Sequence, residues 1–300
     1  MSISHYIKDI GRGRDGARAL DRAQATDLMG QILDGNVSDL ELGAFCIAMR
    51  IKGETAEEMA GFLDATHARL QHIRASSPVV VLPSYNGARK LPVLTALLAH
   101  LLAREGLAVV MHGTATESSR ITSQEVLNAM GVTALDQARA VQAGEVVFAP
   151  TEVLCPGLKR LLDVRRVVGL RNPAHSLVKL MNPTTAADAL LVSSYTHPEY
   201  AISMAATFEL TGARALLLRG TEGEVVADAR RTPQMAAFVH GTRTPLVEAQ
   251  AGSLIKLPEL PTDIDAASTA RYTQAVLNGE LPVPAPLAAQ VQAVLKALSL

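Results

Sequence analysis

The stretch Val109-Val110-Met111-His112-Gly113-Thr114, followed closely by Ser118-Ser119-Arg120, decides the fold. Its apolar first part predicts a buried strand, and the second segment lies where the next helix is expected to begin. Strand ends and helix N-termini present backbone N–H groups to anions, so the pattern predicts an anion-binding loop. The glycine-rich turn that would complete such a site is absent. At its expected position the chain reads Pro83-Ser84-Tyr85-Asn86-Gly87-Ala88-Arg89-Lys90.

Apolar strands alternate with helices on both sides of this loop. The alternation predicts an α/β fold with a mostly parallel sheet. Trp is absent and aromatic residues make up 3% of the chain, so the core is expected to consist of aliphatic side chains. The segment after Thr232 shows no clear pattern before a terminal helix at 287–298. We expect strands at 79–82, 108–111, 189–193 and 215–219, and helices at 94–104, 118–130, 156–168 and 199–211.

The first 73 residues have helical periodicity and no strand pattern. Ser38 with Glu41, and Thr55 with Glu58, have the spacing of capping boxes, which predicts that helices begin at these two places. Ser76-Ser77-Pro78 follows the helices and is predicted to be a hinge between two domains.

Charge is distributed unevenly, although the formal net charge is −1. Five basic residues lie between Lys159 and Arg171, against Asp163 alone, so the neutral total does not exclude nucleic acid as a partner. Cys46 and Cys155 occur in unrelated contexts, which predicts reduced thiols and no zinc site. The N-terminus has no apolar signal segment, and no apolar run is long enough to span a bilayer. We therefore expect a cytoplasmic protein without a membrane partner.

Several short motifs, taken together and in order, resemble the anthranilate phosphoribosyltransferases. The resemblance implies the class III nucleoside phosphorylase and phosphoribosyltransferase fold, in which a small helical domain is hinged to a larger α/β domain and usually mediates dimerisation. It places the helical domain at 1–75, joined in space by about 155–182, and the α/β domain at 76–154 and 183–300. The motifs include Ile32 to Asp39, Gly43-Ala44-Phe45, Lys52-Gly53-Glu54-Thr55, His112-Gly113, Ser118-Ser119-Arg120, Phe148-Ala149-Pro150 and Asn182-Pro183.

The chain departs from these enzymes at the residues that bind their substrate. The enzymes hold phosphoribosyl pyrophosphate with a Gly-Thr-Gly-Gly-Asp turn, whereas Ser84 to Ala88 stands here. Their Asp-Glu pair for magnesium is replaced by Val225-Val226, and valine cannot coordinate a hard cation. Glu222 and Glu224 would restore a metal site only if the register of the loop shifted.

The replaced motifs resemble a divergent branch of this fold, the YbiB-type proteins. The shared strings are Pro83 to Arg89, Arg171 to Leu177, Ser194 to Tyr200 and Arg219 to Glu224. This second resemblance implies a dimeric protein that binds nucleic acid with little sequence preference and has no established transferase activity.

Two groups of basic and polar residues are candidate sites. The basic group suits the phosphate backbone of DNA or RNA, because guanidinium groups bind phosphate bidentately. Its alternatives are a solvated helix face, internal ion pairs, or arginines inherited from the enzymes. The cleft group is a candidate anion site. The alternative is that these residues form an exposed turn and have only structural roles in their loops. Tyr85 lies beside this group and would either stack on a base or pack in the core. The basic group is Lys159, Arg160, Arg165, Arg166 and Arg171, and the cleft group is Asn86, Arg89, Lys90, His112, Ser119 and Arg120.

The preferred hypothesis is a homodimeric, sequence-tolerant DNA-binding protein on a degenerate phosphoribosyltransferase scaffold. It assigns no catalytic residue, no metal ligand and no cofactor. One alternative is a relic of the enzyme whose cleft still accepts a small anion. The other is a phosphoribosyltransferase with an atypical acceptor, which would require Mg²⁺.

Overall fold

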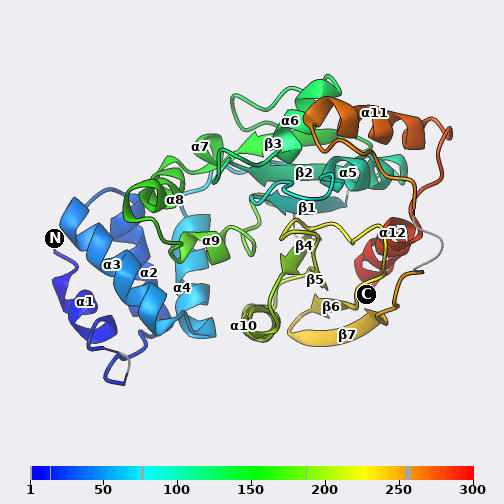
Figure 1. Ribbon diagram of the computed structural model, residues 1–300. Helices are drawn as coiled ribbons and strands as arrows, with labels where there is room; N and C mark the ends of the chain where they lie inside the picture. The colour runs from blue at the N-terminus through cyan, green and yellow to red at the C-terminus, as the bar shows by residue number, and fades with distance from the viewer. Residues whose placement is uncertain (1, 14, 76–77, 187, 254–257) are drawn as a thin grey trace. The chain divides into compact units, whose positions relative to one another are not determined.

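The computed structural model describes residues 2–13, 15–75, 78–186, 188–253 and 258–300, and the chain divides into two units (Figure 1). One unit is helical and consists of Met1–Gln71 and Thr151–Pro183. The other consists of His72–Pro150 and Thr184–Leu300 and contains the sheet. Ser76 and Ser77 of the predicted hinge lie outside the described residues.

Capping boxes determine where the long helices of the helical unit begin. Asp21, Ser38 and Thr55 each accept a hydrogen bond from the backbone N–H three residues later, and that residue's side chain bonds back to the cap. Phe45 and Phe62 meet edge to face in the core, with ring centroids 6.2 Å apart. The helices are α1 (Ser4–Ile10), α2 (Arg22–Leu33), α3 (Asp39–Lys52), α4 (Ala56–His67), α7 (Thr151–Leu154), α8 (Pro156–Val168) and α9 (Ala174–Leu177).

The second unit is built on a seven-stranded sheet with the order β3-β2-β1-β4-β5-β6-β7. The first five strands are parallel, and the last two continue the sheet antiparallel. Strands β1 to β3 are buried along their whole length, as expected for parallel strands in an α/β fold. The strands are β1 (Val79–Ser84), β2 (Ala108–Gly113), β3 (Val146–Pro150), β4 (Leu190–Tyr195), β5 (Ala215–Arg219), β6 (Met235–Val239) and β7 (Thr242–Val247).

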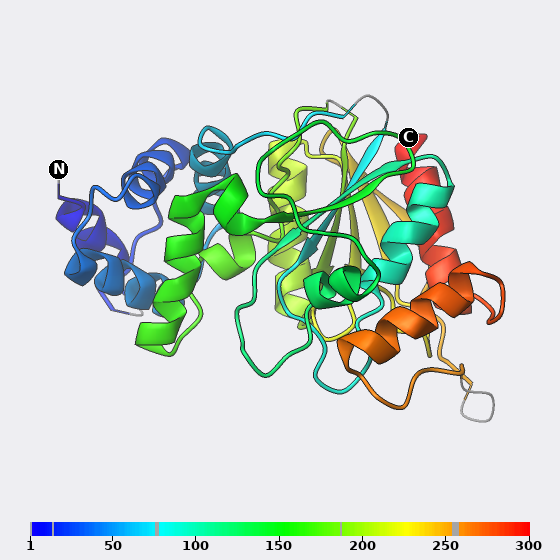
Figure 2. The same cartoon turned by 90° about the horizontal axis from the view of Figure 1, so that it is seen from above.

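Helices cover both faces of this sheet. Figure 2 shows α10 on one face, and α5 and α12 on the other. Aliphatic residues such as Leu97, Leu102 and Leu216 fill the core, in agreement with the scarcity of aromatic residues. Within the described residues, none of the helices has both the length and the apolar character needed to cross a bilayer. The helices of this unit are α5 (Thr95–Arg104), α6 (Ser123–Ala129), α10 (Pro198–Thr211), α11 (Ala266–Leu277) and α12 (Ala285–Leu298).

The α/β class with a mostly parallel sheet and an N-terminal helical region is confirmed, but one helix boundary near the predicted loop is wrong. The helix expected at 118–130 begins at Ser123, because Thr122 and Glu125 form a capping box there. Ser118, Ser119 and Arg120 therefore belong to the preceding turn rather than to the first turn of a helix. Strands β3, β6 and β7 and helices α7, α9 and α11 were not predicted.

Candidate anion-binding site

The segment Tyr85 to Leu91, named here the cradle turn, follows β1 at the edge of the sheet where the parallel strands end. Ala88 anchors the turn by pairing with Ile121, through N–H···O distances of 2.7 and 3.2 Å. Gly87 has a φ of +67°, and a Cβ there would lie 2.7 Å from the Ile121 carbonyl oxygen. The turn therefore needs glycine at this position. The N–H groups of Asn86, Gly87 and Arg89 to Leu91 donate to glutamates of the loop after β5.

Glu224, on the loop after β5, places its carboxylate in the cradle turn and is 2% exposed. One oxygen accepts the backbone N–H groups of Asn86 and Gly87, both at 2.8 Å. The other accepts three hydroxyl groups, from Ser84 Oγ at 2.6 Å, Thr95 Oγ1 at 3.1 Å and Ser123 Oγ at 3.3 Å. Five donors from β1, the turn, α5 and α6 thus meet at one buried carboxylate. A buried charge requires hydrogen bonds of this kind.

Glu222 fills a second position in the same turn. Its Oε2 accepts the backbone N–H groups of Arg89, Lys90 and Leu91 at 2.9, 3.0 and 3.2 Å. Successive N–H groups that point at one oxygen form an anion-binding nest. Partial burial opposes the charge on Glu222, but the three N–H groups and the nearby Arg120 guanidinium outweigh it and lower the pKa of this carboxyl.

Three further contacts fix the loop Gly220–Val226, named here the acidic loop. Ser194 Oγ donates to the Gly223 carbonyl at 3.0 Å, and Asn86 Nδ2 donates to the Glu222 carbonyl at 3.0 Å. Thr221 N donates to the Val226 carbonyl at 2.9 Å, which closes the loop on itself. Glu222 has a φ of +52°, an uncommon conformation for a residue with a side chain.

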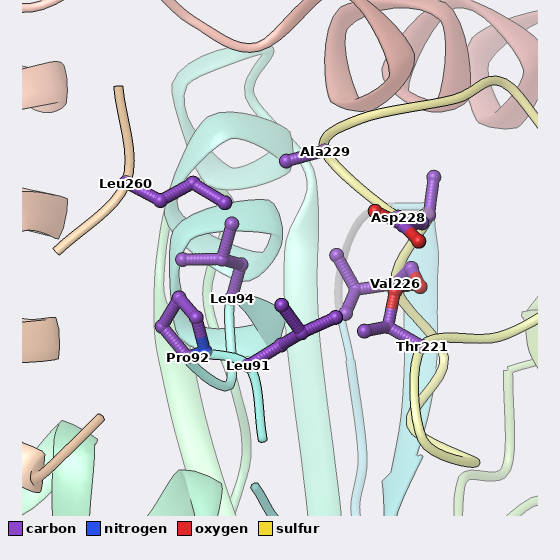
Figure 3. A pocket seen from close by; sticks show the side chains of 9 residues that line it. Leu91, Pro92, Leu94, Thr221, Val226, Asp228, Ala229 and Leu260 are labelled. Carbon is purple, nitrogen blue, oxygen red and sulfur yellow. Dashed lines mark hydrogen bonds between the residues drawn. The ribbon is translucent and has the colours of Figure 1, made fainter. Parts of the chain in front are cut away.

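Val225 and Val226, which the resemblance matches to the enzymes' magnesium ligands, do not fit a metal ion. Val225 and Val226 are each 1% exposed and belong to the aliphatic core. Figure 3 shows that the cavity beside Val226 is lined largely by apolar side chains, and its volume is about 10 Å³, roughly that of one water molecule. Asp228 at its rim is paired with Arg230 at 2.8 Å and Arg231 at 3.2 Å. Among the described residues, no three His, Cys, Asp or Glu side chains group as metal ligands.

The six predicted cleft residues contribute in different ways. Arg89 and Lys90 act through their backbone N–H groups and have exposed side chains, whereas Asn86 uses both its backbone N–H and its side-chain amide. Arg120 is half-buried and forms an ion pair with Glu117 at 3.0 Å. Ser119 is exposed in the turn before α6.

His112, the sixth of these residues, is fully buried on β2. Its Nδ1 lies 2.8 Å from the hydroxyl oxygen of Tyr85, and the two rings meet edge to face at 5.5 Å. Tyr85 is itself 7% exposed, so it packs in the core and is not available to stack on a base. The alternative that gave Tyr85 a packing role is the correct one.

The predicted basic group lies in the helical unit, and its members are not equally available. Lys159 forms an ion pair with Asp163, and Arg166 lies 3.4 Å from the same carboxylate. Arg160 donates to the Ile32 carbonyl at 2.6 Å, and Arg165 is half-buried. The side chain of Arg166 remains 66% exposed, and Arg171 is exposed beyond the end of α8. Arg166 and Arg171 are therefore the members best placed to meet an external anion.

The roles of Glu222 and Glu224 in the cradle turn were missed from the sequence. The turn and the acidic loop are more than 130 residues apart, and no local pattern links the two glutamates to their donors. A weak signal was present, since hydroxyl residues stand at Ser84, at Thr95 and beside the capping box at Ser123.

Comparison with known proteins agrees with this architecture. Residues 4–69 match the family model of the glycosyl transferase family, helical bundle domain. The chain is 41% identical to YbiB of Escherichia coli (strain K12), over 97% of this chain and 92% of that protein. It is 29% identical to the anthranilate phosphoribosyltransferase of Symbiobacterium thermophilum, over 91% of this chain and 81% of the enzyme.

Solved structures show the same fold. Anthranilate phosphoribosyltransferase from Thermus thermophilus superposes with a TM-score of 0.73 at 24% identity, covering 95% of this chain and 85% of the enzyme. The enzyme from Saccharomyces cerevisiae in complex with PRPP and Mg gives a TM-score of 0.68 at 16% identity, covering 99% of this chain and 88% of the enzyme. The chain belongs to the YbiB family, on the anthranilate phosphoribosyltransferase-like scaffold of glycosyltransferase family 3.

Proposed function

We propose that this protein binds nucleic acid, DNA in the first place, through the phosphate backbone and with little sequence preference. The observation that carries the proposal is the excess of cations on α8, which has four basic residues and Asp163 as its one acidic residue. Asp163 is shared by Lys159 and Arg166, so it offsets only part of this charge. Arg171 adds a further exposed cation just beyond the helix. Phosphate contacts of this kind position a nucleic acid without reading its sequence.

The anion-binding site supports a binding function over a transferase function. The donors that would face a phosphorylated substrate are engaged by Glu222 and Glu224. The positions that would carry magnesium ligands are buried valines. In phosphoribosyl transfer the acceptor attacks the ribose C1 and pyrophosphate leaves, and its departure depends on such electrostatic support, so the described arrangement lacks the means to stabilise this leaving group.

We also propose that the protein is a homodimer formed through its helical unit. Leu40 and Ile51 on α3 are 84% and 62% exposed, and Val167 on α8 is 89% exposed. Leu40 and Ile51 are eleven residues apart, which is three helical turns, so they lie on one face of α3. A dimer would cover these apolar side chains. It would also contain two copies of the basic helix α8, which gives a polyanion a larger basic surface to bind.

The test is fluorescence anisotropy of a labelled single-stranded oligonucleotide at about 50 and 200 mM salt, a range over which phosphate-led binding weakens steeply. We expect tight binding at the lower salt and a large loss at the higher salt. Replacing Lys159, Arg160, Arg165 and Arg166 together by Ala should weaken binding about 100-fold or more, because several counterion-release contributions are lost.

A smaller variant tests the two most exposed cations of the basic group, Arg166 and Arg171. Arg166→Ala/Arg171→Ala should weaken binding about 10-fold, whereas Arg18→Ala/Arg50→Ala, which removes two exposed arginines outside α8, should change affinity little. No binding at low salt would remove the proposal. Equal losses in the two double variants would remove α8 from it.

The second candidate is a phosphoribosyltransferase, and its support is the similarity to anthranilate phosphoribosyltransferases over most of the chain. It requires the acidic loop to leave the cradle turn and another source of magnesium ligands. The test is formation of a phosphoribosyl product from phosphoribosyl pyrophosphate, Mg²⁺ and anthranilate. This candidate would be favoured over the first if the wild-type protein forms the product and Glu224→Ala changes the rate of its formation.

A further inference from the structure

The cradle turn, with the hydroxyl groups around it, forms an anion site, and the two glutamates of the acidic loop occupy that site. Eight donors, five at Glu224 and three at Glu222, converge on the carboxylates of two residues separated by Gly223. Backbone N–H and hydroxyl groups of this kind bind phosphoryl oxygens as readily as carboxylate oxygens. The site is therefore built for two linked anionic groups, and both positions are filled by the chain itself.

We propose that the acidic loop is an internal competitor: Glu222 and Glu224 occupy a site suited to a diphosphate-type ligand and close the cradle turn to external anions. This inference goes beyond nucleic-acid binding and does not depend on it. The basic group proposed to hold nucleic acid lies on the helical unit, whereas all the residues of this contact belong to the α/β unit.

External anions compete poorly for the cradle turn because Glu222 and Glu224 are covalently part of the same chain. A group held on a short loop acts at an effective concentration on the order of millimolar or higher, so a weakly binding external anion cannot displace it. The loop is also held by contacts that do not involve the carboxylates, from Ser194 Oγ and Asn86 Nδ2 to the carbonyls of Gly223 and Glu222. These contacts keep the two acidic side chains aimed at the turn.

The backbone conformation of the acidic loop is one that contacts with the cradle turn stabilise. Glu222 adopts a φ of +52° and Gly223 a φ of +92°. A Cβ at position 223 would lie 1.8 Å from Asn86 Nδ2, so glycine is needed where the loop passes the turn. A non-glycine residue held at positive φ costs free energy that surrounding contacts must offset, and the three N–H groups on Glu222 supply such contacts.

Truncating both carboxylates tests the inference directly. Inorganic pyrophosphate, with a metal chelator present, is titrated into the wild-type protein and into Glu222→Ala/Glu224→Ala, by calorimetry and by thermal shift. We expect binding to the wild-type protein to be at or below the limit of detection. We expect the variant to have a lower melting temperature, which pyrophosphate raises, and an affinity at least about ten-fold above that of the wild-type protein, because charge-assisted bonds to the vacated donors become available.

Two further variants keep the test decisive. Glu222→Gln/Glu224→Gln removes the charges but retains side chains that fill the site, so it should bind pyrophosphate less well than the alanine variant. Glu125→Ala is the matched control, because Glu125 also accepts a backbone N–H in this unit, at 2.7 Å, but outside the cradle turn. It should not respond to pyrophosphate.

Three results would overturn the inference. They are equal binding by the wild-type protein, a folded alanine variant without any response to pyrophosphate, and an equal response from Glu125→Ala. If the double alanine variant does not fold, Glu222→Ala is used alone, since Glu222 is only half-buried. Absence of a pyrophosphate response in that folded variant would then overturn the inference. None of these measurements depends on DNA binding, so either proposal can fail alone.

Discussion

The Glu224 carboxylate accepts the backbone N–H of Gly87 at 2.8 Å, across 137 residues of sequence. This contact links the turn after β1 to the loop after β5, two segments at the same edge of the sheet. In α/β folds, this edge is where ligands bind. The N–H groups of the turn thus meet a carboxylate from the same chain, and loss of this contact should lower the stability of the fold.

Glu224→Ala should lower the free energy of unfolding by about 3 kcal/mol, because buried donors on the turn lose their acceptor. Glu224→Gln keeps one acceptor oxygen for the N–H groups of Asn86 and Gly87 and should cost about 1 kcal/mol. Urea denaturation measures both values. Glu125→Ala, which removes an exposed capping partner of α6, provides the comparison at about 0.5–1 kcal/mol. A cost for Glu224→Ala no larger than this would mean that the buried contact contributes little.

Val226→Asp should not create a metal site and should destabilise the fold by about 4 kcal/mol or more, because it buries an unpaired charge in the aliphatic core. Val226→Thr has nearly the same volume without the charge and should cost much less. The variants are compared by thermal denaturation with and without Mg²⁺. Recovery of stability by Mg²⁺ in the aspartate variant alone would contradict the conclusion that this position is unsuited to a metal ion.

Local signals predicted the elements around the site but not the contact at its centre. Capping boxes at Ser38 and Thr55 and the apolar run at β1 act over a few residues, so they are visible in the sequence. The same signal at Thr122 and Glu125 was available and would have corrected the start of α6. The pairing of Glu224 with the turn depends on how β1 and β5 are brought together by the sheet, which no local pattern specifies.

Arg89→Ala/Lys90→Ala tests whether the exposed side chains of the cradle turn take part in DNA binding. Their backbone N–H groups bind Glu222, so side-chain truncation should leave the turn and its stability intact. If both side chains contact phosphates, the slope of log affinity against log salt should fall by about 2 and the affinity by about 10-fold. Anisotropy measured over several salt concentrations gives both values. An unchanged slope would exclude these two side chains from phosphate binding.

Ile51→Glu tests the proposed dimer through the helical unit. Ile51 is 62% exposed, so the substitution should cost the folded monomer little, whereas a carboxylate in an apolar interface should disfavour association. Sedimentation velocity is expected to show a dimer for the wild-type protein and a shift toward monomer for the variant. Ile202→Glu, on the exposed side of α10 in the other unit, is the matched control. A monomeric wild-type protein, or equal shifts in both variants, would contradict this dimer.

Part of the loss of folding stability at acid pH should come from Glu41 alone. The Ser2 hydroxyl and then the backbone and hydroxyl of Ser38 donate to its carboxylate and lower its pKa to about 2. Because the folded-state pKa lies below the usual value of 4.5, its contribution to stability is present above pH 4.5 and is lost as the pH falls toward 2. Glu41→Gln should therefore flatten the fall in stability across this range. NMR titration of the Glu41 carboxyl supplies the direct measurement, and Ser2→Ala should raise its pKa. An ordinary pKa in the wild-type protein would show that the N-terminal segment does not hold this carboxylate in solution.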